Sequence, residues 1–494
     1  GAARRGSRDA QEMTRLVAGP FNRVEGDLEI KLDVEIGAVT AAYVNSPLYR
    51  GFEQILLGKA PLDALVYAPR ICGICSVSQS AAAAKALAKA QGLTAPKNGA
   101  LLQNVILAAE NVADHLTHFY MFFMPDFAQP VYAGEPWYDL AAARFQCISG
   151  QAQREFLPAR AAFLHVMGLA AGHWPHTLGV QPGGITRAIG LNVQSRLTGH
   201  VLALRRFLET AFFGDVLESV AGLASGAALA EWAEARGRDS DFGRFLAFAR
   251  ALGLESLGRG SDNFLSYGAY DLNGKAAFAK GIYKAGTVAP FDPGNITEDH
   301  TSSWLVRADG PRAPSRGLTV PDANASGAYS WCKAPRLAGE VAETGALARQ
   351  LVDGQPLVRD LVQGSGGNVS SRVIARAIEV ARLIPLMERW IWEIRAGDPF
   401  CAHATMPDEA KGEGLIEAAR GSLGHWLEIR KGRIFNYQIV APTTWNFSPR
   451  DSAGQPGACE QSLVGAPVRK GETTPIAVQH IVRSFDPCMV CTVH

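Results

Sequence analysis

The sequence predicts an α+β fold that is mainly helical, in which a long helical core carries an N-terminal β region and a β-rich insertion. Three observations predict this fold. Polar and apolar residues alternate over 27–44, which is the period of a half-buried strand. Between 98 and 396, apolar residues recur every three or four positions, as they do in helices. Residues 257–334 are rich in Gly, Pro, Asp and Ser, with short aromatic runs at 264–270 and 304–306, a composition typical of strands and turns.

Seven helices follow from these patterns. The first covers the alanine-rich run 80–91. Ser76 or Ser78 can cap it, which places Cys75 at a helix N-terminus, where the dipole favours a thiolate. Pro125 should end the second helix, because proline cannot continue the backbone hydrogen bonds. The helices after the first are expected over 98–124, 152–168, 186–213, 228–251, 370–396 and 476–485.

The chain length bounds the domain organisation. A chain of 494 residues is long enough for about three domain-sized units and for a core that shields a cofactor from water. We expect an N-terminal β region with the first cysteine pair, a helical core, the β-rich insertion, more helical core and a C-terminal region. The predicted bounds of these segments are 1–95, 96–256, 257–340, 341–400 and 401–494.

Composition excludes several classes of partner. The 48 basic and 47 acidic residues leave almost no net charge to attract nucleic acid or an acidic membrane. No apolar run approaches the roughly 18–20 residues that span a bilayer, and residues 1–15 contain no hydrophobic targeting segment. Four isolated cysteines, at 147, 332, 401 and 459, are expected to be free buried thiols. These features favour a cytoplasmic protein.

Two Cys-x-x-Cys pairs carry the strongest chemical information. Cys72 and Cys75 lie near the N-terminus, and Cys488 and Cys491 lie near the C-terminus. This spacing suits zinc, redox dithiols and soft transition metals alike. A zinc ribbon normally closes a short loop, whereas 413 positions separate Cys75 from Cys488, so either two separate sites or one four-thiolate site is possible at this point.

Seven short motifs narrow these alternatives. No single motif is specific, but the ordered set, from about residue 20 to the C-terminus, resembles the large subunit of nickel-iron hydrogenases. The motifs are Arg23-Val24-Glu25-Gly26, Arg50-Gly51-Phe52-Glu53, Arg70-Ile71-Cys72-Gly73-Ile74-Cys75, Asp114-His115-Leu116 with His118-Phe119-Tyr120, Arg420-Gly421-Ser422-Leu423-Gly424-His425-Trp426, Pro442-Thr443-Thr444-Trp445-Asn446, and the run from Asp486 to His494.

The resemblance implies a metal centre. Cys72 and Cys488 would be terminal nickel ligands, and Cys75 and Cys491 would bridge nickel to an iron that carries one carbon monoxide and two cyanides. Cys488 also counts as catalytic, because a terminal cysteine sulfur would be the first proton acceptor when H2 is cleaved heterolytically. We expect that proton to pass to Glu25, which matches the proton-relay glutamate of the family.

Further residues would shape the pocket around the iron. Arg420, Pro442 and Thr443 match family positions near the cyanides, where a guanidinium and a hydroxyl can donate hydrogen bonds. Arg420 is counted among the catalytic residues, although guanidinium holds its proton too strongly to be a good base. Residues surrounding this first layer would hold Arg420 or order water; they are Asp114, Asp486, His118 and Gln79.

A second metal is also implied. Glu53 and His494 match the ligands of a magnesium or similar hard ion in this family, with the backbone near Val440 as a third donor. The alternative is a solvated tail histidine. Because family members are often made with a tail that is cut after this histidine, we expect the chain either to be processed there or to end there.

Departures from the commonest family pattern suggest a subgroup. Gln79 stands where most large subunits carry a histidine, and Ala419 stands where proline is common. Ile74 and Phe122 replace smaller residues along the gas channel, where bulk would slow oxygen more than H2; ordinary core packing is the alternative. Together with Gln79, they resemble the regulatory, H2-sensing hydrogenases and their cyanobacterial-type uptake relatives.

We therefore expect the catalytic subunit of an oxygen-tolerant, cytoplasmic H2 sensor of low turnover. It should pair with a small subunit that carries iron-sulfur clusters, as a heterodimer or a dimer of heterodimers, and pass its signal to a kinase. One alternative is an uptake hydrogenase that feeds an electron acceptor of a respiratory chain and is membrane-associated through partner subunits. Two others are a metal-free structural subunit of a quinone-reducing complex and a zinc-bound scaffold.

Overall fold

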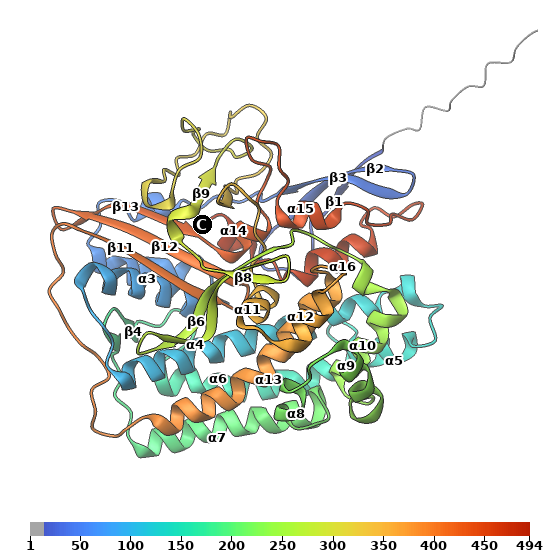
Figure 1. The fold of residues 1–494 in the computed structure, drawn as a ribbon, viewed down its shortest axis with the longest axis horizontal. Coiled ribbons are helices and arrows are strands. Elements are labelled where there is room, and N and C mark those ends of the chain that lie inside the picture. The colour runs from blue at the N-terminus through green and yellow to red at the C-terminus, as the bar shows by residue number, and fades with distance from the viewer. Residues whose placement is uncertain (1–13) are drawn as a thin grey trace, which may run out of the picture.

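The computed structural model describes residues 14–494 of the chain (Figure 1). The predicted lack of a targeting segment concerns residues 1–15, of which the first thirteen lie outside the described part. Within that part, no helix is both long enough and apolar enough to cross a membrane.

A layer of long helices forms the base of the molecule (Figure 1). Helices α4 (Lys97–Thr117), α6 (Gln151–Ala171), α7 (Leu191–Phe207) and α13 (Val369–Glu393) pack against one another there. The largest apolar cluster runs through this layer and reaches both cysteine pairs. A mainly helical α+β fold was predicted, and the structure confirms it. The other helices are α1 (Phe52–Ile55), α2 (Ala64–Tyr67), α3 (Ser76–Gln91), α5 (Tyr138–Phe145), α8 (Leu217–Ala221), α9 (Gly226–Trp232), α10 (Asp241–Leu252), α11 (Ala346–Asp353), α12 (Pro356–Val362), α14 (Pro442–Asn446), α15 (Ala458–Leu463), α16 (Ile476–Ser484) and α17 (Met489–Thr492).

Several helix boundaries differ from the prediction. The predicted helix 228–251 is interrupted between α9 and α10, and Ser240 starts the second helix by accepting a hydrogen bond from the Gly243 amide at 3.0 Å. Helix α4 gives way after Thr117 to a π-helical turn over His118–Phe123, before Pro125 is reached. Helix α7 begins at Leu191 rather than at residue 186.

Three antiparallel three-stranded sheets lie on one side of the layer of long helices (Figure 1). The alternating region 27–44 forms a hairpin of two strands, and the predicted strand 264–270 lies within β6. In the run 304–306, in contrast, only Leu305 makes a bridge, an isolated one with Pro321. The sheets are β1 (Thr14–Ala18), β2 (Glu29–Glu35) and β3 (Ala38–Asn45); β6 (Asn263–Leu272), β7 (Lys275–Lys284) and β8 (Thr287–Ala289); and β11 (Ala410–Ala418), β12 (Gly421–Arg430) and β13 (Arg433–Val440). Two short pairs complete the strands, β4 (Val180–Gln181) with β5 (Gly184–Ile185) and β9 (Ile296–Asp299) with β10 (Ala334–Leu337).

The sheet β11–β13 was not predicted, although it positions the site. Its central strand β12 is buried on both faces over most of its length, so the sequence shows no alternation. Helix α3 packs tightly on β11 because Gly412 and Gly414 have no side chain. A Cβ at Gly414 would lie 1.9 Å from the Ala82 carbonyl oxygen, and one at Gly412 would lie 2.0 Å from that of Ala86.

The C-terminus lies inside the molecule, beside α14 (Figure 1). Helix α17 contacts α14, and His494 is only 4% exposed. The chain end is therefore part of the interior, next to the loop that carries the first cysteine pair.

Candidate metal centre

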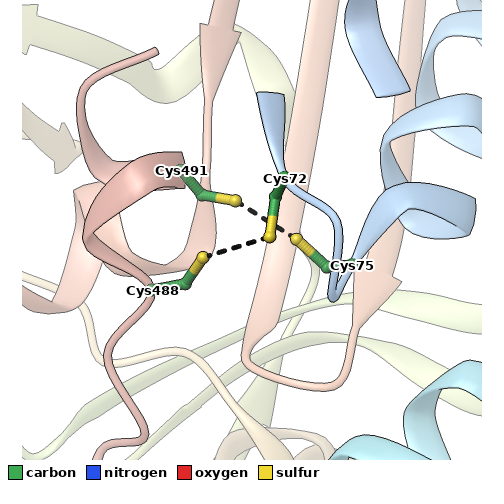
Figure 2. A group of neighbouring side chains, drawn as sticks. All are labelled: Cys72, Cys75, Cys488 and Cys491. Atoms are coloured by element: carbon green, nitrogen blue, oxygen red, sulfur yellow. Dashed lines mark hydrogen bonds between the residues drawn. The ribbon is translucent and has the colours of Figure 1, made fainter. Parts of the chain in front are cut away.

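Four cysteine sulfurs converge at one buried point (Figure 2). The Sγ atoms of Cys72 and Cys488 are 3.6 Å apart, and those of Cys75 and Cys491 are 3.1 Å apart. All four sulfurs lie within 4.8 Å of one another. The two pairs thus form one site, which excludes the alternative of two separate sites.

Local structure places each cysteine pair at the start of a helix. Cys72 and Cys75 lie in the loop between a 3₁₀ turn (Ala68–Ile71) and α3, with Cys75 as the N-cap of α3. Cys488 likewise immediately precedes α17, and Cys491 lies within it. Burial raises the pKa of Cys488, whereas a hydrogen bond from Cys488 lowers the pKa of Cys72. Four thiols in so small a volume cannot all ionise unless a cation offsets their charge.

The segment that carries Glu25 lies beside the second cysteine pair and is joined to it by backbone hydrogen bonds. The amide of Met489 donates to the Glu25 carbonyl at 2.7 Å, and Glu25 forms a parallel bridge with Cys488. Gly26 permits this approach: its φ is +80°, and a Cβ there would lie 3.1 Å from atoms of Met489 and Val490. The Glu25 side chain is half-buried, and burial followed by the nearby Cys72 raises the pKa of its carboxyl.

Arg50 joins the two cysteine loops. Its guanidinium donates to the carbonyl of Ile71 at 2.6 Å and also to the carbonyl of Val490. These carbonyls immediately precede Cys72 and Cys491. Sequence analysis placed Arg50 in a motif without giving it this role.

Arg420 is held by two aspartates in the interior. Its Nη1 donates to the Asp114 carboxylate at 2.8 Å, its Nε donates to the Asp486 carbonyl at 2.9 Å, and its Nη2 donates to the Asp486 carboxylate at 3.1 Å. Burial by itself would raise the pKa of Asp486, but the charge of Arg420 lowers it. Burial would lower the pKa of Arg420, but both aspartates raise it. Arg420 therefore stays charged.

Thr443 and Pro442 begin helix α14 beside the second pair. The Thr443 hydroxyl accepts a hydrogen bond from the Cys488 amide at 3.1 Å. Because the hydroxyl oxygen accepts in this contact, its own proton can still be donated to another group. The contact also holds the backbone of Cys488 beside α14.

The remaining predicted residues of the surrounding layer take different positions. The Gln79 amide nitrogen lies 3.8 Å from the Cys491 sulfur. The ring of His118 lies 2.6 Å from the Arg483 carbonyl through Nε2. Burial followed by the charge of Arg376 lowers the pKa of His118 to about 3, so this ring is neutral. Ile74 and Phe122 are both half-buried, and Ile74 packs against the main apolar cluster.

Glu53 and His494 lie together as predicted, with a lysine that sequence analysis did not anticipate. The Glu53 carboxylate lies 3.2 Å from Nε2 of His494 and accepts from the Ile439 amide at 2.7 Å, so the backbone before Val440 lies against it. The ammonium of Lys333 lies 2.9 Å from Glu53 and 2.5 Å from Glu298. The other Glu53 oxygen is buried without a partner.

The four isolated cysteines are free, as expected. The expectation of burial was only partly right. Cys332 and Cys459 are buried, but Cys401 is half-buried and Cys147 is exposed.

Glu110 is the most prominent residue that sequence analysis missed. Its carboxylate accepts hydrogen bonds from the amides of Val77 and Ser78 at 2.8 Å each, and from the Trp174 ring nitrogen at 3.0 Å. It thus caps α3 from the neighbouring helix α4, and the predicted caps Ser76 and Ser78 instead lie within α3. Because the cap comes from 32 residues away, no local sequence pattern could reveal it.

Comparison with known proteins identifies the family. The family described as nickel-dependent hydrogenase matches residues 50–155 and 132–494. The large subunit of the periplasmic [NiFeSe] hydrogenase of Desulfomicrobium baculatum is 30% identical over 98% of this chain and 96% of its own length. The Hydrogenase-2 large chain of Escherichia coli (strain K12) is 28% identical over 97% of each chain.

Solved structures agree with the sequence relatives. The Ni-Fe-Se hydrogenase from D. vulgaris Hildenborough in the reduced state superposes with a TM-score of 0.83, at 30% identity, over 98% of this chain and 100% of that one. The family match reaches residue 494 and so includes the segment that carries the second cysteine pair. The chain therefore belongs to the nickel-dependent hydrogenase family, as a large subunit that activates H2.

Proposed function

We propose that this subunit holds a nickel-iron group on Cys72, Cys75, Cys488 and Cys491 and is the H2-splitting component of an oxygen-tolerant H2 sensor. The observation that carries the first part is the convergence of four buried sulfurs within 4.8 Å. Within residues 14–494, no other set of three or more His, Cys, Asp or Glu side chains converges in this way.

The donor set fits such a group. Four thiolates are soft, electron-rich ligands that suit nickel and iron, and they need a cation to remain ionised when buried. Cys72, Cys75, Cys488 and Cys491 would hold the group, with Cys72 and Cys488 as the proposed terminal ligands and Cys75 and Cys491 as the proposed ligands shared by both metals. When bound, the group supplies the heterolytic cleavage of H2.

The protein's own residues would then move the proton. Glu25 forms the backbone bridge with Cys488 described above, and its raised pKa makes its carboxylate a better proton acceptor than an exposed one. Arg420 stays charged between Asp114 and Asp486, so it serves as a fixed donor rather than as a base. Cys488 and Glu25 thus form the start of the proposed proton path.

The residues around Glu53 fit a hard divalent ion such as magnesium. Nδ1 of His494 lies 3.0 Å from the Cys491 carbonyl, which orients the ring so that Nε2 presents a lone pair to the Glu53 carboxylate. Two acceptors facing each other need a proton or a cation between them. The backbone near Val440 is the third proposed ligand of the ion. Lys333 supplies part of the positive charge that balances Glu53 and Glu298.

The finer role rests on three residues. Gln79, Ile74 and Phe122 resemble the regulatory hydrogenases at their positions, which supports a sensor that is cytoplasmic and acts through a kinase. The runner-up is uptake: the uptake hydrogenase large subunit of Rhodobacter capsulatus is 26% identical over 97% of this chain. The predicted division into five segments also stays a proposal.

Either role requires a partner for electrons. The relatives are named as large subunits or large chains, and the described residues offer no second cysteine cluster for an iron-sulfur group. A small subunit with iron-sulfur clusters would therefore complete the enzyme, as a heterodimer or a dimer of such heterodimers.

Infrared spectroscopy of the purified complex, in air and then under H2, tests the proposal. Carbonyl and cyanide stretches should be present, and they should shift promptly under H2 without prior reductive activation. Stretches that shift only after long reduction would favour the uptake role. A complex with zinc, no nickel and no such stretches would overturn the proposal and support a scaffold.

A further inference from the structure

A chain of hydrogen bonds leads from the Cys491 sulfur into the sheet β11–β13. The Gln79 amide nitrogen lies 3.8 Å from Sγ of Cys491, and its amide oxygen lies 2.8 Å from Nε2 of His425. On its other side, Nδ1 of His425 lies 2.7 Å from the hydroxyl of Tyr437. All four side chains are at most 2% exposed.

Helix α3 and the sheet β11–β13 bring these residues together. Gln79 lies one turn into α3, which the glycines of β11 allow to pack closely on the sheet. Leu427 is the residue paired with Tyr437 across β12 and β13, so His425 and Tyr437 are diagonal neighbours on one face. Their rings are 5.5 Å apart, edge to face.

The contacts allow one arrangement of donors. Gln79 turns its nitrogen toward the sulfur, so its oxygen must accept from His425 and Nε2 must carry the hydrogen. A neutral imidazole then has a lone pair on Nδ1, and Tyr437 must donate to it. Burial lowers the pKa of His425 to about 3 and raises that of Tyr437, so the ring stays neutral and the hydroxyl keeps its proton.

We propose that His425 and Tyr437 are positioning residues that lock the Gln79 amide with its N–H toward Cys491, and so tune the electron density on that metal ligand. The inference rests on the proposed function, because Cys491 must bind the nickel-iron group for the tuning to matter. Neither His425 nor Tyr437 touches the sulfur; both act through Gln79.

Loss of the Tyr437 hydroxyl would unlock the chain. Without that hydroxyl, Nδ1 of His425 has no hydrogen-bond partner, so neither tautomer of the ring is held in place and Nε2 can present a lone pair. The Gln79 amide can then turn over, offering its nitrogen to His425 and its oxygen to the sulfur. A donated hydrogen bond to Cys491 would be replaced by repulsion between two electron-rich atoms, which raises electron density at the metals.

Infrared spectra of the purified complex with Tyr437→Phe test this inference. The carbonyl stretch is expected to shift to lower frequency relative to wild type, with the nickel content unchanged. Tyr120→Phe is the matched control: Tyr120 is equally buried and loses one hydrogen bond, to Asp241 at 2.8 Å, but lies in the helical layer outside this chain. The control spectrum should coincide with wild type.

A double-mutant cycle separates positioning from general disruption. Gln79→Leu removes the amide that links the chain to the sulfur. Adding Tyr437→Phe to Gln79→Leu should then move the carbonyl stretch no further. Equal shifts from Tyr437→Phe in both backgrounds, or an unshifted stretch in Tyr437→Phe alone, would overturn the inference. Absence of the stretches from wild type would instead overturn the proposed function.

Discussion

The guanidinium of Arg420 donates a 2.8 Å hydrogen bond to the carboxylate of Asp114, and both residues are only 3% exposed. They are 306 positions apart, so this contact joins helix α4 to the turn between β11 and β12. Asp486, two residues before Cys488, accepts from the other side of the same guanidinium. Arg420 therefore couples the helical core to the loop that carries the second cysteine pair.

Arg420→Lys should lower H2 oxidation at least about 10-fold while nickel stays bound. Lysine keeps the charge but loses the planar fork, and one buried hydrogen bond to a charged group is worth about 1.5–3 kcal/mol. Hydrogen uptake and metal analysis check this. Arg336→Lys is the control, because Arg336 is equally buried against Asp451 and makes no hydrogen bond to the four cysteines of the metal site. Similar losses of activity in both variants would contradict a specific role for Arg420.

Glu25→Gln should abolish exchange between H2 and deuterated water while the metals and their infrared bands remain. Glutamine fills the same space but cannot take up a proton. The measurement is mass spectrometry of the gas phase. Glu35→Gln, at the exposed end of β2, should exchange like wild type. Continued exchange in Glu25→Gln would remove Glu25 from the proton path.

Replacing Ile74 by Val and Phe122 by Leu should make the enzyme sensitive to air. The smaller side chains widen the proposed gas channel. This widening should increase the entry of oxygen more than it increases the entry of H2, which is the smaller molecule. Activity under H2 with stepwise additions of oxygen measures the change. Leu48→Val is a matched change at an exposed position. If the double variant resists oxygen as well as the wild type does, Ile74 and Phe122 do not restrict the entry of oxygen and the channel hypothesis is wrong.

Glu110→Ala should destabilise the subunit by about 2–4 kcal/mol and reduce its nickel content. It leaves the amides of Val77 and Ser78 without their acceptor at the start of α3, where Cys75 lies. Glu110→Gln keeps one acceptor oxygen and should lose less. Thermal unfolding and metal analysis of the complex report both effects, and an alanine variant as stable as the glutamine one would show that the cap is unimportant.

His480 should make stability fall in acid. Burial lowers the pKa of His480 to about 4, although the charge of Asp126 opposes this shift. In the unfolded chain the histidine has its ordinary pKa of about 6.5, so between pH 6.5 and pH 4 the unfolded chain binds a proton that the folded protein does not. Its neutral state therefore costs nothing above pH 6.5, and stability decreases as pH falls from there to 4, by up to about 3 kcal/mol.

The variant His480→Gln tests that pH dependence. The unfolding temperature of the complex should fall less steeply between pH 6.5 and pH 4 than in wild type. His165→Gln changes an exposed histidine and should keep the steep profile. Parallel profiles for wild type and His480→Gln would assign the acid sensitivity to other groups.

Sequence patterns predicted the parts of the fold that depend on local order. The alternation before Val44 follows the two faces of a hairpin, and the apolar spacing of α4, α6 and α13 follows helices that pack together within one layer. Strand β12 was not predicted because both of its faces are buried, so its sequence does not alternate between polar and apolar residues. The break before α10 was not predicted because the apolar spacing continues on both sides of it. Only the cap provided by Ser240 marks where α10 begins.

The candidate site divides in the same way. The four cysteines, Arg420 and Thr443 lie in motifs and could be located from the sequence, and the structure brings them together. Glu110, Lys333 and Tyr437 could not be found, because each acts on a residue more than ten positions away, with ordinary sequence around it. Their roles follow from three-dimensional proximity, not from any pattern along the chain.

The buried position of the last seven residues has a consequence in time. Cys72 and Cys488 are 416 positions apart, and a ribosome adds about 5–20 residues per second. The first two thiols therefore exist for roughly 20–80 s before the second two are made. During that interval only Cys72 and Cys75 of the future site have been made, and residues 488–494 complete the site when they pack beside α14. Any metal-loading step that needs access to Cys72 and Cys75 has its widest opening before residues 488–494 have packed beside α14.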